Sequence, residues 1–313
     1  MTASPSAGKL RAASGRSVVA DKAATVVLWG MGGFVLLLLG LIILHFVIAS
    51  IGVMSLSFIF GEPGSDTELG GVGPLLFNSL YMLVLAMLIA VPLGLLAGIY
   101  MSEYAADNKV TSTIRFAEEA ISSVPSIVVG LFGLIAFVNL THWGFTALAG
   151  VLALTLFNLP LMARLSEQAL QAVPQEERSA SLALGATKWQ TIRHVVVPLA
   201  IPGIVTGIIL TAGRVFGEAA VLLFTAGVGT PHHYNFLNLN IFDENSPWSP
   251  FRHTAATLSV FIWKTNSEGT YASQQLQQQV GDGASALLLA TVLIFNIGSR
   301  FLGRLLTRRL TAA

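Results

Sequence analysis

The sequence predicts an all-α, polytopic membrane protein with six transmembrane helices. Of its 313 residues, 54% are hydrophobic and only 11% are charged, whereas a soluble domain has about 25% charged residues. The hydrophobic residues also gather in runs long enough to cross a hydrocarbon core of about 30 Å at a helical rise of about 1.5 Å per residue. We therefore expect a helical bundle in a lipid bilayer.

Six runs meet this length requirement. They are residues 24–51, 75–100, 120–140, 145–165, 201–224 and 284–306. Pro92, Pro125 and Pro160 lie inside three of them, and a membrane helix tolerates proline where neighbouring groups satisfy the freed backbone atoms. This favours a packed bundle. We expect residues 24–313 to form one transmembrane domain and residues 1–23, rich in Ala, Ser and Gly, to form a disordered cytoplasmic tail.

The distribution of positive charge predicts the orientation of the chain. Fourteen of the 17 lysines and arginines flank the expected spans on one side, Arg252 and Lys264 lie on the other side, and Arg214 lies within a span. Positively charged flanks remain in the cytoplasm. Both termini and residues 167–200 are therefore expected in the cytoplasm, and the longest outer loop is residues 225–283.

The polar segment 167–200 has the pattern of two short helices. We expect a break at Gly185, because glycine readily adopts the left-handed conformation that ends a helix. Thr187 and Gln190 have the spacing of a capping box, which opens a second helix, and Pro198 is expected to end it. By pattern alone, this hairpin either closes a long loop or receives a partner protein.

The spacing in this segment resembles the cytoplasmic loop of membrane subunits of ATP-binding cassette (ABC) importers. That loop reads E-A-A, three residues, G, nine residues, I-x-L-P. The corresponding positions here are Ser179, Ala180, Ser181, Gly185, Val195, Val197 and Pro198, so serine replaces the glutamate, although Glu176 and Glu177 lie nearby.

The resemblance implies the type I importer (MetI-like) permease fold and a loop that docks on an ATPase. It assigns ATPase coupling to Ser179, Ala180, Gly185, Thr187, Trp189 and Pro198. The spacing of Trp189, Ile192 and Val196 places them on one face of the second helix.

Motifs for catalysis within the chain itself are missing from the sequence. The Gly8–Lys9 pair lacks the glycine spacing of a phosphate-binding loop, so ATP is expected to bind partner subunits. The six histidines form no H-E-x-x-H pattern and the sequence contains no cysteine, which predicts no metal site, no cofactor and no catalytic residue. A net charge of +1 gives no indication of nucleic-acid binding.

Polar residues inside the spans are candidates for the substrate pathway. Arg214 and Glu218 are four residues apart in the fifth span and are expected to share a helix face. Charges at that depth cost about 2.5–3.5 kcal/mol each on insertion scales, so the two either form a structural ion pair or mark the route of an anion. Asn78 and Asn158 either contact substrate or join helices, and Arg164 either lies on the pathway or sets the topology.

A second resemblance concerns the substrate. R-x-x-G-E at 214–218, LLFTAG at 222–227, SVPSIVVGLFGL at 123–134, IYMSEYA at 99–105 and the R-x-x-E of Arg164 and Glu167 resemble the "A" type of the paired phosphate importer permeases. Ala219 and Val221 depart from that pattern, which commonly has Thr and Pro there.

This second resemblance implies a cell-membrane phosphate importer that works by alternating access. Its expected partners are a homologous second permease subunit, two ATPase subunits and an extracytoplasmic phosphate-binding protein. Two alternatives remain at this point: an ABC importer for another oxyanion or small solute, and an ATP-independent secondary transporter, which would have inverted repeats.

Overall fold

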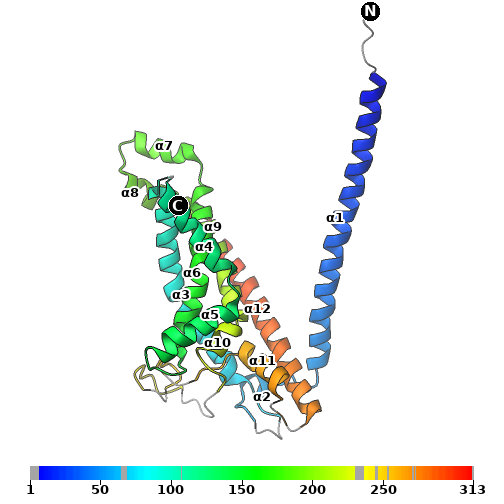
Figure 1. The fold of residues 1–313 in the computed structure, drawn as a ribbon, viewed down its shortest axis with the longest axis vertical. Helices are drawn as coiled ribbons and strands as arrows, with labels where there is room; N and C mark the ends of the chain where they lie inside the picture. The colour runs from blue at the N-terminus through cyan, green and yellow to red at the C-terminus, as the bar shows by residue number, and fades with distance from the viewer. Residues whose placement is uncertain are drawn as a thin grey trace, which may run out of the picture. The chain divides into compact units, whose positions relative to one another are not determined.

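The computed structural model describes residues 7–64, 69–106, 108–229, 236–243, 246–251, 254–269, 271 and 273–311, except for the side chains of residues 7–17, 302 and 304–311. All regular secondary structure in these residues is helical (Figure 1). The chain divides into two units, Met1–Ile51 and Gly52–Ala313. The all-helical prediction is confirmed.

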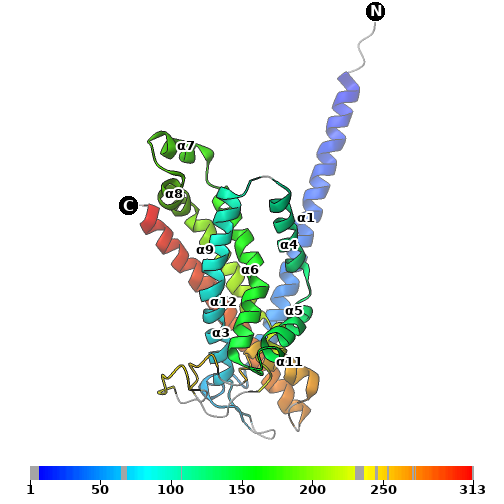
Figure 2. The same cartoon turned by 60° about the vertical axis from the view of Figure 1, so that its left-hand side comes forward.

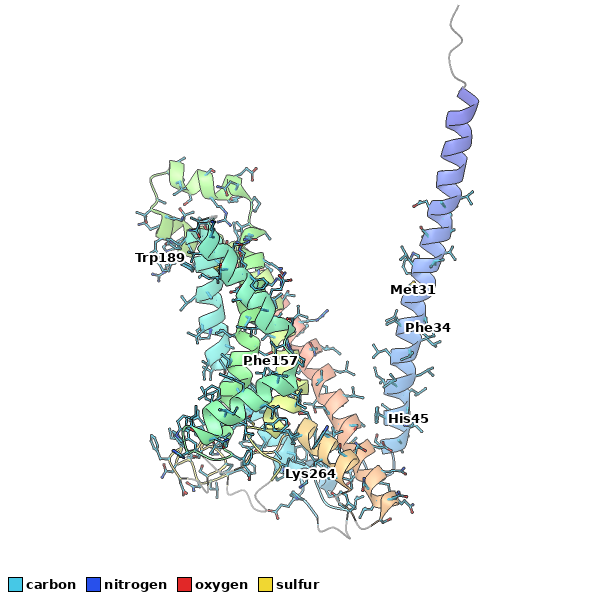
Figure 3. The ribbon with its side chains drawn as sticks, viewed as in Figure 1. Met31, Phe34, His45, Phe157, Trp189 and Lys264 are labelled. Atoms are coloured by element: carbon cyan, nitrogen blue, oxygen red, sulfur yellow. The ribbon has the colours of Figure 1, made fainter. Side chains whose placement is uncertain are left out.

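The described part of the first unit is one helix, α1 (Ala7–Ser50). It contains an apolar stretch, Val18–Ser50, with none of its most apolar window buried, and side chains leave it on all sides, as Met31, Phe34 and His45 illustrate (Figure 3). A helix that is hydrophobic all round is suited to lipid. The first expected span is therefore confirmed as a helix.

The N-terminal part of α1 differs from expectation. We expected residues 1–23 to be a disordered tail, but the described part of it, from Ala7 onward, is helical. Alanines at 7, 12, 13, 20 and 23 explain this, because alanine has the highest helix propensity and no proline follows Pro5 in this stretch.

Four long helices form the centre of the second unit. They are α3 (Gly73–Ile99), α6 (Ala147–Gln171), α9 (Val197–Gly217) and α12 (Gln274–Thr311). Helix α3 packs on α6 and α9, α6 packs on α9, and α9 packs on α12 (Figures 1 and 2). The buried core that joins them includes Met82, Leu83, Ala86, Val151, Leu154, Ala212, Val215, Phe216, Ala284 and Leu287.

Small residues bring α3 and α6 close together. A Cβ atom added at Gly98 would lie 2.6 Å from the Cβ of Ser166, and one added at Gly94 would lie 2.6 Å from the Cγ of Met162. The two glycines have the four-residue spacing that lets membrane helices approach closely. Pro92 and Pro160 remain inside α3 and α6 as expected.

The third expected span, residues 120–140, is not a straight helix. The structure has α4 (Lys109–Ser123), then a bend of 97°, then α5 (Ser126–Gly133) continued by the π-turn η2 (Leu134–Asn139). Val124 is extended, with ψ of 132°, because the residue before a proline disfavours helical conformation, and Pro125 follows. Five described helices are long and apolar enough to cross a membrane, and this bent pair makes six if it counts as one span.

The fifth expected span, residues 201–224, is also interrupted. Helix α9 ends at Gly217, Glu218 is extended with ψ of 119°, and the short helix α10 (Ala220–Leu223) follows. Helix α10 packs on α5. The break therefore occurs beside Arg214, at the charged part of the span.

Shorter helices complete the second unit. Helix α2 (Leu56–Phe60) packs on α3, and α11 (Leu258–Glu268) packs on α3 and α12. Helices α7 (Gln175–Ala183) and α8 (Lys188–Thr191) lie at one end of the bundle, which we call the hairpin end, while α2 and α11 lie at the opposite end, which we call the far end (Figures 1 and 2).

Candidate functional site

The segment between α6 and α9 folds as a helical hairpin, residues 175–196, which we call the α7–α8 hairpin. Gly185 has a φ of +84°, so the expected left-handed break is confirmed. The Thr187 side chain accepts the N–H of Gln190 at 3.3 Å, and the Gln190 side chain accepts the N–H of Thr187 at 2.8 Å. The predicted capping box is therefore present, and it satisfies two backbone donors at the start of α8.

The second arm does not end at Pro198, contrary to expectation. Helix α8 runs through the π-turn η3 (Ile192–Val196) directly into α9, where Pro198 occupies the first turn. Proline has no N–H to donate and is tolerated at a helix start. The hairpin is consequently joined to α9 by continuous helix, which suits it to transmit movement.

The tip of the hairpin exposes apolar side chains. Leu184 is 90% exposed and Trp189 is 53% exposed, whereas Ile192 and Val196 are buried. Trp189 was expected to share one face with those two residues, but its side chain is exposed at the margin of the bundle (Figure 3) while theirs are buried. An exposed tryptophan at a tip is typical of a docking surface.

Ser179 and Ala180 lie on the exposed part of α7. The Ser179 hydroxyl donates to the carbonyl of Gln175 at 3.0 Å, within its own helix. It offers no charge to a partner. The carboxylates of Glu176 and Glu177 are exposed in the first turn of α7, so negative charge is present on this arm, about one turn before the position where the importer loop pattern has glutamate.

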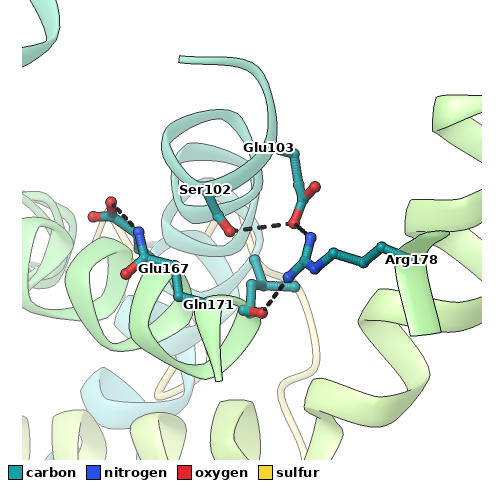
Figure 4. A network of polar contacts seen from close by, with 6 residues as sticks. Ser102, Glu103, Glu167, Gln171 and Arg178 are labelled. Atoms are coloured by element: carbon teal, nitrogen blue, oxygen red, sulfur yellow. Dashed lines mark hydrogen bonds and ion pairs between the residues drawn. The ribbon is translucent and has the colours of Figure 1, made fainter. Parts of the chain in front are cut away.

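A cavity of about 650 Å³ lies under the hairpin and is lined by residues from η1 (Tyr100–Tyr104), the end of α6 and both arms. A polar network borders it (Figure 4). In this network Arg178 forms an ion pair with Glu103, and Gln171 donates to Glu167 at 3.0 Å. The sequence did not indicate the role of Glu103, although it lies in the IYMSEYA run, or any role for Arg178 beyond its positive charge.

Arg214 lies half-buried in α9, and its guanidinium carbon is 4.2 Å from the centre of the Phe157 ring of α6. The face of an aromatic ring attracts a cation. Figure 3 shows Phe157 in the middle of the bundle. The second unit thus holds a positive charge between helices, as the sequence suggested.

Glu218 is not the partner of Arg214 in the described structure. Its carboxylate accepts the N–H of Val221 at 3.3 Å and so caps α10, and its carbonyl accepts the hydroxyl of Ser259 at 2.9 Å. Neither ion pair found among the described residues joins it to Arg214. The expected shared helix face is absent because α9 ends at Gly217.

Asn78 and Asn158 are fully buried between helices. The Asn78 amide donates to the carbonyl of Ala256 at 2.8 Å, which joins α3 to the segment before α11. The Asn158 amide donates to Leu154 within α6 at 2.8 Å, and its Oδ1 atom is buried without a partner among the described residues. Neither side chain reaches an open surface in this conformation.

Arg164 is exposed at the hairpin end and lines a cavity of about 250 Å³ with Arg115, Glu118, Glu119 and Glu167. Glu167 pairs with Arg115 of α4 at 2.8 Å. The two residues of the R-x-x-E pattern therefore lie at the same cavity, but the arginine bound to Glu167 comes from another helix. Within the described residues, no group of three or more His, Asp or Glu side chains is placed to hold a metal.

A bundle of membrane-spanning helices with an interrupted span and a projecting helical hairpin is the arrangement that the resemblance to membrane subunits of ABC importers implied. Its backbone is similar to a chain of a bacterial alginate ABC transporter, solved in complex with an alginate-bound periplasmic protein (TM-score 0.59, 13% identity, covering 93% of this chain and 97% of that one). It is also similar to a chain of the MetNI methionine ABC transporter in an inward-facing conformation (TM-score 0.53, 22% identity, 77% and 94%). At these identities the likeness concerns the fold.

The chain belongs to the family described as "Binding-protein-dependent transport system inner membrane component", which matches residues 90–312. It is 46% identical over 298 residues to a probable ABC transporter permease protein, YqgI, of Bacillus subtilis, covering 94% of this chain and 98% of that protein. It is 34% identical over 240 residues to the phosphate transport system permease protein PstA 1 of Mycobacterium tuberculosis, covering 77% and 73%.

Proposed function

We propose that this ABC importer permease carries inorganic phosphate. Its similarity to proteins named as phosphate permeases supports this substrate, and the observation that carries the proposal is Arg214, a half-buried cation in the middle of the bundle. An arginine presents a planar fork of donors that engages two oxygens of a compact oxyanion without losing its charge. Neither ion pair found in the described part of the chain involves Arg214, so no carboxylate there competes for its guanidinium.

The proposed cycle is alternating access driven by ATP in partner subunits. The α7–α8 hairpin docks on an ATPase through Trp189 and Leu184, and Gly185 and Thr187 hold its two arms at a set angle. Because η3 runs without a break into α9, movement of the hairpin turns the helix that carries Arg214. In this scheme the hairpin end faces the cytoplasm, with both chain termini, and the far end receives a phosphate-loaded binding protein.

The complete assembly is proposed to contain a homologous second permease subunit and two ATPase subunits. Arg164, at the cavity on the hairpin end, is proposed to meet the anion as it leaves. Asn78 and Asn158 are buried and are proposed to join helices in this conformation, with the unpaired Oδ1 of Asn158 available to a donor when the helices move.

Transport in proteoliposomes tests the substrate. The chain, its partner subunits and the binding protein are reconstituted, and ATP-dependent uptake of radiolabelled phosphate is measured with sulfate, molybdate or arsenate as competitor. We expect uptake that needs ATP and that sulfate and molybdate leave intact. Uptake of sulfate or molybdate in preference to phosphate would overturn the substrate, and phosphate uptake driven by an ion gradient without ATP would overturn the mechanism.

The second candidate for the transported substrate is another oxyanion, such as sulfate or molybdate. The relative with 46% identity is named only as a probable ABC transporter permease, and an arginine fork also suits other oxyanions. The competition measurement separates these cases, because each oxyanion is tested against phosphate on the same vesicles.

A further inference from the structure

The short π-turn η1, at the end of α3, contacts both arms of the α7–α8 hairpin. Glu103 of η1 pairs with Arg178 of the first arm. The next residue, Tyr104, lies under Lys188 of the second arm, with Nζ 4.8 Å from the ring centre. Two consecutive residues of one turn thus contact both arms, which are joined to each other by the turn at Gly185 and by a hydrogen bond of 2.9 Å between the hydroxyls of Ser181 and Thr191.

The pair between Glu103 and Arg178 is largely shielded from solvent. The two side chains are 9% and 12% exposed, and the Ser102 hydroxyl donates to the same carboxylate oxygen at 3.2 Å. The second guanidinium nitrogen of Arg178 donates to the carbonyl of Leu170 at 2.7 Å (Figure 4). Removal of one partner would leave a largely buried charge uncompensated, so the loss of this pair is costly.

Arg178 consequently joins α7 and the end of α6, which are consecutive in the chain, to η1, the turn that follows α3. Helix α3 has 27 residues and extends about 40 Å at the helical rise. Near its other end Asn78 donates to Ala256 at the far end of the bundle. Movement of the hairpin therefore reaches the far end through α3, in addition to the covalent route through α9.

We propose that Glu103 and Tyr104 are positioning residues that couple the hairpin to α3, and that transport follows ATP hydrolysis only while both contacts are intact. This inference rests on the proposed function in one respect, that the hairpin receives the ATPase. The ion pair holds the first arm and the cation–π contact holds the second, so α3 is displaced whichever arm is pushed.

The test measures ATP hydrolysis and phosphate uptake on the same proteoliposomes, reconstituted with the complete transporter. For Glu103→Gln we expect the ATPase to co-purify at the wild-type ratio and to hydrolyse ATP, while uptake per ATP falls by about fivefold or more, the size of typical coupling between sites. The double substitution Glu103→Arg with Arg178→Glu exchanges the two charges and should restore most of the phosphate uptake per ATP. Tyr104→Leu should lower phosphate uptake per ATP, whereas Tyr104→Phe, which keeps the ring, should leave it unchanged.

Lys109→Gln is the matched control, because Lys109 is an exposed cation at the same end of the bundle and lies outside the network. It should leave uptake per ATP unchanged. A Glu103→Gln transporter with the wild-type ratio would overturn the inference, and so would equal losses of uptake and hydrolysis that parallel a lower melting temperature. Failure of the proposed function looks different, since then the wild-type chain itself neither retains an ATPase nor takes up phosphate with ATP.

Discussion

Arg214 and Phe157 face each other across the α6–α9 interface, with the guanidinium carbon 4.2 Å from the ring centre. Glu218, the carboxylate expected beside Arg214, instead caps α10 through the N–H of Val221. An arginine that packs on a ring keeps its donors for an anion. The positive charge of Arg214 is therefore not neutralised by Glu218, as it would be in an ion pair.

Replacement of Arg214 by glutamine should lower phosphate uptake by about tenfold or more, since a hydrogen bond to a charged group contributes about 1.5–3 kcal/mol. ATPase co-purification should remain at the wild-type level. Arg214→Lys keeps the charge without the fork and should retain intermediate uptake. Uptake is measured with labelled phosphate in proteoliposomes, and a fully active Arg214→Gln transporter would make the residue purely structural.

Gly185→Val should weaken ATPase binding. Nothing lies within 4 Å of a Cβ added there, so the cost is conformational, about 1–2 kcal/mol for a left-handed residue, and the hairpin would relieve it by opening. Gly144 provides the control, because it has a φ of +70° and equally open surroundings in the turn before α6. We expect less ATPase to co-purify with Gly185→Val, and the wild-type amount to co-purify with Gly144→Val.

Trp189→Ala should weaken binding of the ATPase at little cost to folding. The side chain is 53% exposed, and loss of a tryptophan anchor at an interface costs about 2 kcal/mol or more. Affinity for the purified ATPase in detergent is the readout, with an unchanged melting temperature. Trp143→Ala, at a side chain 41% exposed before α6, is the comparison and should bind normally. Equal ATPase affinity in the two variants would contradict a docking role for the hairpin tip.

Gly98→Val should destabilise the bundle, because its Cβ would lie 2.6 Å from that of Ser166 and 2.8 Å from the backbone nitrogen of Glu167. Overpacking of this kind costs about 1–3 kcal/mol and would force α3 away from α6. Melting temperature followed by size-exclusion chromatography measures it. Gly298→Val in α12, where nothing lies within 4 Å, should melt like the wild type; equal melting of both variants would mean that α3 and α6 do not need this contact.

Local features of the sequence predicted local features of the structure well. The Thr187 capping box and the left-handed Gly185 depend on residues within four positions of each other, and both are present. The errors occur where helix continuity depends on its surroundings. Pro125 bends the third span by 97°, whereas Pro92 and Pro160 remain inside helices, and proline content alone does not distinguish these outcomes.

The candidate site was predicted only in part, again because helix continuity depends on the surroundings of the helix. Arg214 could be selected because a charge in an apolar run is expensive, but its neighbour was assigned by helical spacing, which holds only if the helix continues. The break after Gly217 gave Glu218 a new role. Glu103 was not selected because a carboxylate at the end of a span is ordinary until its partner is known.

The amino-acid sequence by itself determined that this chain is helical, embedded in a membrane and provided with a polar hairpin, because hydrophobicity, capping and glycine conformation act over a few residues. Only the tertiary structure decided which side chains meet. Glu103 and Arg178 are 75 positions apart, and Arg214 meets Phe157 from another helix, so each pairing depends on how α3, α6 and α9 pack. Helix packing depends on many weak contacts between segments that are distant in the sequence. Local sequence patterns therefore do not show which side chains become partners.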